Sequence, residues 1–147
     1  MAAASLLNNT RLIFKHLLDS HCFDRVLKNL EVVAASRGAC TCELEVTEDH
    51  LNRAGALHGG FTATLVDSVS TVAILTADKP PGVSVDLSVT YLSPARAGDT
   101  LVVTAECLKL GRSIVFASVD IRNKKDGVLV AQGRQTKHLG PQKQPSN

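Results

Sequence analysis

Asp67 is the residue whose position in the sequence most clearly indicates chemistry. It is the only ionisable side chain between Gly59 and Ala77, a run of 19 residues that is otherwise apolar, small or hydroxylated. A carboxylate is costly to bury unless it has hydrogen-bonding partners or a catalytic role. On a helix it would share a face with Ala63, Thr64, Ser70, Thr71 and Ile74. From the residues alone, a catalytic acid and a structural aspartate bonded to nearby hydroxyls are equally good interpretations.

A second feature lies at the start of the same run, where His58 is followed by Gly59 and Gly60. If a helix begins here, the N–H of Gly59 has no intrahelical acceptor and carries part of the positive end of the helix dipole. Such a donor can stabilise negative charge on a carbonyl oxygen, by roughly 3–4 kcal/mol in a transition state. The alternative is that these three residues form only a tight connection into the helix.

The periodicity of the apolar residues predicts the elements that hold these groups. Residues 1–22 and 23–30 have helical spacing, and the run from Gly59 to Ala77 predicts one long helix of about 28 Å. Alternation with a period of two predicts strands at residues 40–46, 83–92, 100–109, 113–123 and 128–138. We therefore expect an α+β fold, in which a curved antiparallel sheet with four consecutive strands at its end wraps around the long apolar helix.

Length and composition limit the classes of protein to consider. The 147 residues make one domain, 1–147, and the 44% hydrophobic content is enough for a packed core. A net charge of +2 and 3% aromatic residues argue against nucleic acid as a partner. Six Ser or Thr residues and Asp67 make the run from Gly59 to Ala77 a poor membrane span, so we expect no stable membrane insertion.

The two ends of the chain bear on location. In residues 1–22, Arg11 and Lys15 stand among leucines, with no acidic residue before Asp19. This pattern is typical both of an ordinary first helix and of a mitochondrial targeting segment. Four cysteines without a preceding secretory signal indicate reduced thiols, so we expect a cytoplasmic or mitochondrial protein, or one found in both places. Residues 140–147 are polar and predict a loose tail.

Two stretches carry a family resemblance: residues 57–67, which read LHGGFTATLVD, and residues 82–86, which read GVSVD. With them, residues 23–139 resemble the hotdog-fold acyl-CoA thioesterases, and in particular their small phenylacetate-type group. The resemblance implies hydrolysis of a fatty acyl-CoA thioester, of medium to long chain, to a free fatty acid and CoA. It implies no cofactor, because CoA enters as part of the acyl-CoA substrate.

The resemblance also implies roles for single residues. Asp67 would activate water as a general base or attack the thioester directly, and the N–H of Gly59 would polarise the thioester carbonyl. Asn52 and His58 would orient these groups, and Ser84 would help to hold the water. The residues that the resemblance places against CoA are Asp86, Tyr91, Leu92, Ser93, Pro94, Ala95, Arg96, Lys109, Leu110, Gly111, Arg112, Ser113, Ile114 and His138.

Two of these segments, residues 93–96 and 109–113, are predicted turns that carry cations. Turn amides together with a nearby Arg or Lys can hold a phosphate group, so we expect free backbone donors there for CoA. The alternative is that both segments are ordinary solvated turns.

A distance argument from the residues themselves predicts a site made by two subunits. Gly59 and Asp67 are eight residues apart, which is about 12 Å along a helix axis. One carbonyl group therefore cannot contact both in the same chain. If both act, Asp67 must face Gly59 of a second copy, which gives a homodimer with two shared sites. We expect a dimer of dimers, a homotetramer, as the larger assembly.

Two other functions fit part of the same pattern. A hotdog-fold enoyl-CoA hydratase or dehydratase needs an Asp/His pair that meets two neighbouring substrate carbons, and no such signature is evident here. A non-catalytic carrier of acyl-CoA or fatty acid would use the apolar helix without the acid. No metal site is convincing, since His50 and His58 are eight residues apart across a loop without further ligands.

Overall fold

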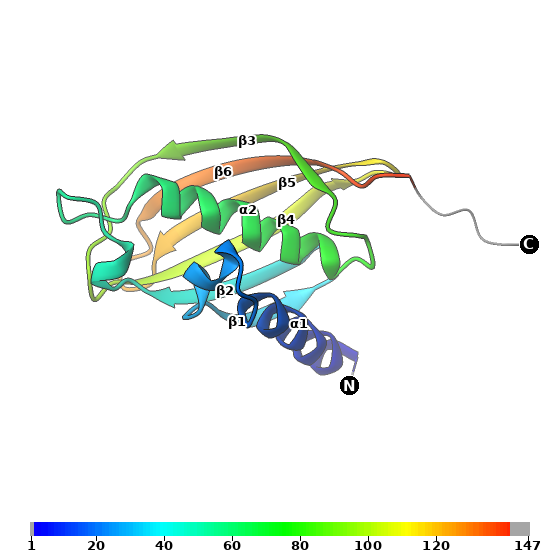
Figure 1. The fold of residues 1–147 in the computed structure, drawn as a ribbon, viewed down its shortest axis with the longest axis horizontal. Helices are drawn as coiled ribbons and strands as arrows, with labels where there is room; N and C mark the ends of the chain where they lie inside the picture. Colours follow the sequence, from blue (N-terminus) through cyan, green and yellow to red (C-terminus); the bar gives the residue numbers. More distant parts are fainter. Residues whose placement is uncertain (1, 142–147) are drawn as a thin grey trace, which may run out of the picture.

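The computed structural model describes residues 2–141, which form two α-helices, two short 3₁₀ helices and one six-stranded antiparallel sheet (Figure 1). In chain order the elements are α1 (Ala2–Leu18), η1 (Phe23–Leu27), β1 (Glu31–Ser36), β2 (Ala39–Glu45), η2 (Glu48–His50), α2 (Gly59–Leu75), β3 (Val83–Tyr91), β4 (Thr100–Leu110), β5 (Ile114–Asn123) and β6 (Leu129–His138). One long helix lies across a curved sheet, which confirms the predicted α+β class.

The long helix α2 packs against one face of the sheet, and α1 lies beside it near β1 (Figure 1). Leu65, Val66 and Val69 of α2 are completely buried in the core. In β6, a Cβ added at Gly133 would lie 2.5 Å from Val66. The missing side chain at Gly133 therefore allows α2 to approach the sheet closely.

The strands that form the centre of the sheet follow the predicted alternation. Cys40 and Cys42 of β2 are buried, as is every second residue from Leu101 to Ala105 in β4 and from Val115 to Ile121 in β5. The Cys40 thiol donates a hydrogen bond to the carbonyl oxygen of Val69 at 3.4 Å. Its hydrogen bond with Cys42 and its burial raise the pKa of the Cys40 thiol, so both cysteines act as small core side chains.

The position of β3 differs from the sequence prediction. The strand order is β1-β2-β4-β5-β6-β3, so β3 pairs with β6 at one edge of the sheet and not with β4, and β6 does not close the sheet. The connection from β3 to β4 explains the difference, because it passes the start of α2, where Leu57 N–H donates to Ala95 O at 2.8 Å. The connection then leads into β4, which pairs with β2 and not with β3.

A β-bulge sets the direction of the side chains at the start of β3. In the pairing with β6, Ser84 is opposite Lys137 and Asp86 is opposite Thr136, so Val85 is an extra residue. Strict alternation would place Ser84 on the face opposite Val89 and Tyr91. The bulge brings Ser84 to the helix side of the sheet together with these two residues.

Most apolar side chains of β3 are uncovered in the single chain. Val83, Val85, Leu87 and Tyr91 are all exposed, and of the predicted apolar face only Val89 packs against the core. The outer edge of β3 also has no neighbouring strand in the described sheet. The single chain thus leaves both an open strand edge and exposed apolar side chains at β3, which are features of interaction surfaces.

The remaining differences concern β1, which is not among the strands that alternation predicts, and the ends of elements. α1 ends at Leu18, the helical spacing of residues 23–30 forms only the 3₁₀ helix Phe23–Leu27, and α2 ends at Leu75. Thr76 is the C-cap of α2. Its hydroxyl accepts from Gly38 N–H and donates to Ala73 O. None of the helices in residues 2–141 has the length and apolarity to cross a membrane. The predicted tail 140–147 lies outside the described residues except for its first two positions.

Candidate active site

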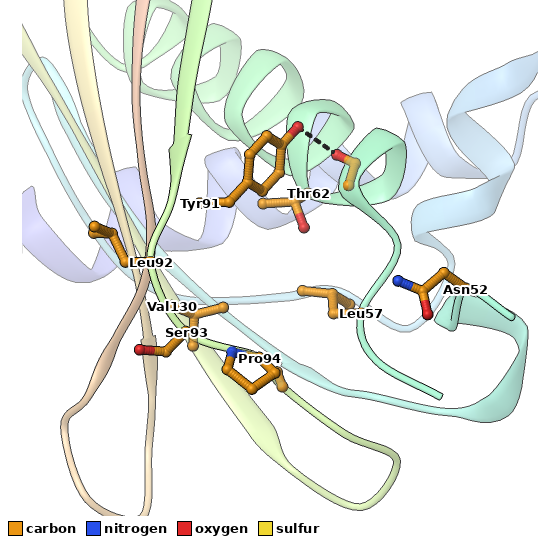
Figure 2. Close-up of a pocket in the computed structure, with 10 residues that line it drawn as sticks. Asn52, Leu57, Thr62, Tyr91, Leu92, Ser93, Pro94 and Val130 are labelled. Carbon is orange, nitrogen blue, oxygen red and sulfur yellow. Dashed lines mark hydrogen bonds between the residues drawn. The ribbon is translucent and has the colours of Figure 1, made fainter. Parts of the chain in front are cut away.

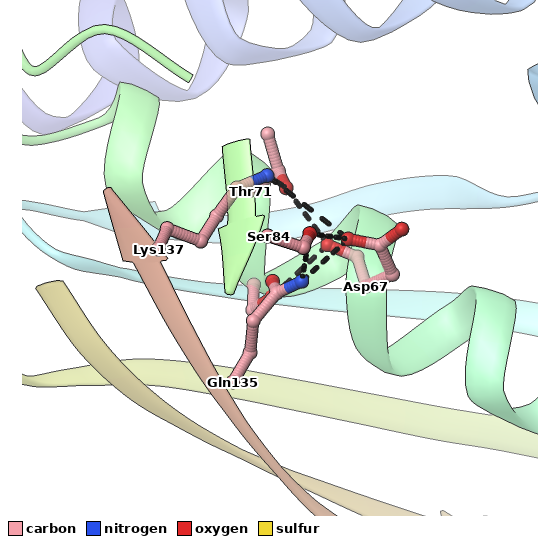
Figure 3. Close-up of polar contacts among 6 residues, drawn as sticks. Asp67, Thr71, Ser84, Gln135 and Lys137 are labelled. Carbon is pink, nitrogen blue, oxygen red and sulfur yellow. Dashed lines mark hydrogen bonds and ion pairs between the residues drawn. The ribbon is translucent and has the colours of Figure 1, made fainter. Parts of the chain in front are cut away.

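A hydrogen-bonded cluster surrounds Asp67 in the middle of α2 (Figure 3). Asp67 Oδ1 accepts from Ser84 Oγ at 3.2 Å and from Gln135 Nε2 at 2.6 Å, and Lys137 Nζ lies 4.0 Å away. Within residues 2–141 no hydrogen bond reaches Oδ2, and the Asp67 side chain is 47% exposed. One carboxylate oxygen is therefore open to accept a hydrogen bond from water.

Gln135 connects the members of this cluster. Its Nε2 donates to Ser84 Oγ at 2.7 Å as well as to Asp67, and its Oε1 accepts from the Ser70 hydroxyl. The residue is 1% exposed. Because the amide is held at both ends in a buried position, it fixes the Asp67 carboxylate and the Ser84 hydroxyl relative to each other.

Lys137 is the buried cation beside Asp67. Its Nζ donates to Thr71 Oγ1 at 2.6 Å, and Thr71 lies one helical turn after Asp67. Burial lowers the pKa of the Lys137 ammonium, and the nearby Asp67 carboxylate offsets part of this shift. Hydrogen-bond donors and a cation thus surround the inner side of the Asp67 carboxylate. An ionised carboxylate can only accept hydrogen bonds, so it needs such donors.

Gln135 and Lys137 are site residues that the sequence analysis missed. They are two residues apart, so they lie on the same face of β6, and the pairing of β3 with β6 places them next to Ser84. The opposite face carries Arg134 and Thr136, which are also polar. Alternation therefore does not show which set is buried. One feature of the sequence could have indicated such residues: a carboxylate on a buried helix needs hydrogen-bond donors from another element.

A cavity of about 390 Å³ lies at the N-terminal end of α2 (Figure 2). Gly59 forms part of its wall, and as the first residue of α2 its N–H has no intrahelical acceptor. Tyr91 closes one side, where its hydroxyl donates to Gly59 O at 2.9 Å (Figure 2). The other lining residues are Asn52, Leu57, Thr62, Leu92, Ser93, Pro94, Ala95 and Val130. The structure thus brings Gly59 together with five of the residues expected to contact CoA, Tyr91 to Ala95.

Asn52 shapes the loop that leads to α2. Its Oδ1 accepts from the N–H of Ala54 at 2.9 Å and from the N–H of Ala56 at 3.2 Å. Its backbone N–H donates to Ala56 O at 2.7 Å, which closes the loop. Asn52 also borders the Gly59 cavity, so it is placed to position the Gly59 segment, as an orienting residue would be.

His58 caps α2 and faces a different cavity. Its Nδ1 accepts from Gly60 N–H at 2.9 Å, which makes His58 the N-cap of the helix. It lines a cavity of about 720 Å³ together with His50 and Phe61, whose rings stack at 4.3 Å. Burial lowers the pKa of His50. Across residues 2–141 no three His, Cys, Asp or Glu side chains gather closely enough to hold a metal ion.

Most of the remaining residues expected to contact CoA, Lys109 to Ile114 and His138, lie at the other end of the sheet. Ile114 pairs with His138, and His138 pairs with Val83, whereas Tyr91 pairs with Ala131. The turn between β4 and β5 lies at the Val83 end and holds Lys109, Leu110, Gly111, Arg112, Ser113 and Ile114. Eight residues of strand separate Val83 from Tyr91, which is about 27 Å. One chain therefore keeps the two predicted groups of CoA contacts far apart.

The expectation of free backbone donors in the two turns is wrong at three positions. The N–H of Ser93 donates to Val130 O at 3.1 Å, the N–H of Arg96 donates to Asp99 Oδ2 at 2.8 Å, and the N–H of Gly111 donates to Ile114 O at 3.0 Å. Short turns use the last two amides to close themselves, so all three are occupied before any ligand arrives. The Arg96 guanidinium donates to Gly55 O at 3.3 Å, and Asp86 is exposed on β3, so neither lies in the wall of the Gly59 cavity.

The predicted catalytic residues thus form two groups at the two ends of β3. Gly59 and Asn52 lie with Tyr91 around one cavity, and Asp67 and Ser84 lie around another. The cavity that Gly59 lines does not include Asp67, and the cavity that Asp67 lines does not include Gly59. Each group has half of what hydrolysis of an activated acyl group requires: an amide donor in one case, and an acid with a place for water in the other.

The helix across a curved sheet and the groups around Gly59 and Asp67 can be compared with known proteins. A family model described as "Thioesterase superfamily" matches residues 54–130, which is more than half of the chain. The chain therefore belongs to the thioesterase superfamily, and the hotdog-fold resemblance is confirmed.

Individual relatives agree with this assignment. The chain is 49% identical to acyl-coenzyme A thioesterase 13 of Mus musculus over 138 residues, which cover 93% of this chain and 99% of the relative. It is similar to the crystal structure of zebrafish thioesterase superfamily member 2, with a TM-score of 0.89, 52% identity, and coverage of 91% and 98% of the two chains. A hypothetical thioesterase protein from Streptococcus pneumoniae, solved with coenzyme A, has a TM-score of 0.74, 28% identity, and coverage of 80% and 90%.

Proposed function

We propose that this protein hydrolyses fatty acyl-CoA thioesters of medium to long chain to free fatty acid and CoA, at sites shared between two copies of the chain. Membership of the thioesterase superfamily and the name of the mouse relative support the reaction and the substrate class. The relative solved with coenzyme A supports CoA as the leaving group. The observation that carries the shared site is that Gly59 and Asp67 border different cavities although both lie on α2.

The exposed edge of β3 supports a second copy as the missing surface. An antiparallel pairing of β3 with the β3 of a twofold-related copy satisfies the open edge and covers its exposed apolar side chains. In that arrangement the Tyr91 end of one chain lies beside the Val83 end of the other. Gly59 of one subunit then faces the partner's Asp67, and two equivalent sites result.

The chemistry in such a site divides between the subunits. The Gly59 N–H of one subunit donates to the thioester oxygen and stabilises the charge that develops there. The partner's Asp67 accepts a proton from a water that Ser84 helps to hold, or it attacks the carbonyl carbon itself. In the first route the water oxygen bonds to the carbonyl carbon, the carbon–sulfur bond breaks, and CoA leaves as a thiolate that takes up the proton.

The same arrangement places CoA against both subunits. The cavity lined by Tyr91 to Ala95 takes the part of CoA next to the sulfur, because it holds Gly59. The turn from Lys109 to Ile114 and His138 come from the partner, since they lie at the Val83 end of the sheet. Arg112 and Lys109 then supply positive charge for the phosphates. Arg96 contributes a third cation, from the Gly59 end of the sheet.

The release of free thiol from acyl-CoAs of graded chain length tests this function. We expect the wild type to release CoA, and the Asp67→Asn variant to lose about 10²–10⁴-fold in kcat, because a positioned acid or base contributes an acceleration of that order. Acyl-CoA binding without release by the wild type would show a carrier instead. Addition of water to enoyl-CoA without cleavage of the thioester would show a hydratase.

A further inference from the structure

Asp67 borders a cavity of about 310 Å³ whose opposite wall comes from the N-terminal segment of the chain. Phe14, Leu17 and Leu18 of α1 and Leu27 of η1 contribute apolar side chains to this wall. One side of the cavity thus carries the polar cluster of Asp67, and the other side is aliphatic and aromatic apart from Asp24 of η1. A cavity with this division fits a molecule that is reactive at one end and apolar along the rest.

The position of α1 is fixed by contacts with the core and with β1. Phe14 is buried in the core, and Arg11 Nε donates to Val32 O of β1 at 2.8 Å. These contacts hold the helix against the sheet and leave its last turn beside α2. The wall next to Asp67 is therefore a preformed part of the fold and needs no rearrangement to receive a ligand.

Apolar surface around the cavity is left uncovered. Leu17 is 37% exposed, whereas Leu27 deeper in the wall is fully buried. An alkyl chain lying along Leu17 would remove this surface from water. Of the charged groups that line the cavity, Lys137 is engaged by Thr71 and faces Asp67, and Asp24 accepts from the Cys22 thiol at 3.7 Å.

We propose that the acyl chain of the substrate lies in this cavity against the last turn of α1, and that Leu17 limits the length of chain accepted. This inference rests on the proposed thioesterase function. The residues matched by the family model begin at 54, after α1 and η1. The matched region therefore supplies Asp67 and Gly59. The segment before it supplies the wall that contacts the acyl chain and limits its length.

The expected dependence on chain length follows from burial. Each methylene that enters the cavity raises kcat/KM by about fourfold, which corresponds to a transfer free energy of about 0.8 kcal/mol. The increase stops when the chain reaches the wall, and longer chains gain nothing further or lose rate.

Leu17→Trp tests the proposal, with Leu12→Trp as the matched control. Leu12 is on the same helix, is 66% exposed and does not line the cavity. Values of kcat/KM are measured for saturated acyl-CoAs of increasing length. We expect Leu17→Trp to move the optimum to shorter chains while the shortest substrate keeps its rate within about twofold, and Leu17→Ala to move the optimum to longer chains. Leu12→Trp should match the wild type.

Two results would overturn the proposal and leave the function intact: chain-length profiles of Leu17→Trp and Leu12→Trp that coincide, or a loss in Leu17→Trp that is equal for all chain lengths. Absence of thiol release by the wild type from every acyl-CoA would instead overturn the proposed function, and this inference with it.

Discussion

Ser84 donates a hydrogen bond to Asp67 across 3.2 Å, and a β-bulge in β3 turns the Ser84 side chain toward Asp67. Regular alternation would turn the Ser84 side chain away from α2. The extra residue, Val85, reverses its direction, so an acid on a helix and a hydroxyl on a strand meet at one point. Bulges near active sites serve this purpose in many folds, because they aim one side chain without moving the rest of the strand.

Gln135 holds both members of this pair, so we expect Gln135→Leu to lower kcat with little change in KM. Loss of a hydrogen bond to a charged group costs about 1.5–3 kcal/mol, which corresponds to about 10- to 100-fold in rate. Gln132→Leu is the matched control, because Gln132 lies on the same strand and donates to Asp120 on the outer face. Steady-state kinetics of both variants check the prediction, and equal kcat values for the two would contradict it.

Periodicity was sufficient to predict the long helix and most strands, since each has one apolar face or is apolar throughout. It was not sufficient to place β3, because the partner of an edge strand depends on the route of a connection far from it. The exposed apolar residues of β3 look like core residues in the sequence. Their burial requires a surface that one chain does not contain.

Gly133→Ala tests the close approach of α2 to the sheet. A Cβ at this position would meet the side chain of Val66, which is branched and cannot rotate away easily. We expect a loss of about 1–3 kcal/mol in the free energy of unfolding. Urea unfolding of Gly133→Ala, Val66→Ala and the double variant provides the measurement. If Val66→Ala does not recover part of the loss caused by Gly133→Ala, the contact is not the cause.

Lys137→Met tests the electrostatic cost of the buried cation. Burial lowers the pKa of Lys137, so folding disfavours its charged form, and an apolar side chain of similar size removes that cost. We expect the free energy of unfolding near pH 7 to rise by about 1 kcal/mol. The advantage should shrink toward alkaline pH, where the wild-type ammonium of the folded state deprotonates before that of the unfolded state.

Lys124→Met is the comparison for this variant, because Lys124 forms an exposed ion pair with Glu43 at 2.7 Å. We expect a change within about 0.5 kcal/mol there. A clear loss of stability in Lys137→Met would show that its bonds to Thr71 and Asp67 outweigh the cost of burial.

His50 predicts a stability that depends on pH below neutrality. It is buried, its Nδ1 accepts from Thr47 N–H at 3.0 Å, and burial lowers its pKa. Between this lowered pKa and about 6.5, the unfolded chain binds more protons than the folded one. The free energy of unfolding therefore falls as the pH drops through that window, by up to about 1.4 kcal/mol per pH unit. Denaturant unfolding across this range should show a weaker slope for His50→Gln, and identical slopes would contradict the prediction.

The candidate site, like the fold, was predictable from the sequence only in part. Asp67 and Gly59 were candidates because a lone acid in a buried helix and a glycine at its start are unusual in sequence, and the family resemblance then implied their roles. Gln135 and Lys137 were not identifiable, because β6 is polar on both faces near them. Their role depends on which strand lies beside β3, and that is a property of the tertiary structure.

Co-expression of two inactive variants tests the central claim, a site shared between subunits, most directly. Asp67→Asn removes the acid, and Gly59→Pro removes the amide donor with little disturbance, because proline is tolerated at the first position of a helix. The backbone of His58, with φ −65° and ψ 131°, already suits a residue before proline. Each variant alone should be nearly inactive. In a statistical mixture half of the dimers contain one of each chain, and one of their two sites is intact, so we predict thiol release at about a quarter of the wild-type rate. A mixture no more active than the separate variants would contradict the shared site.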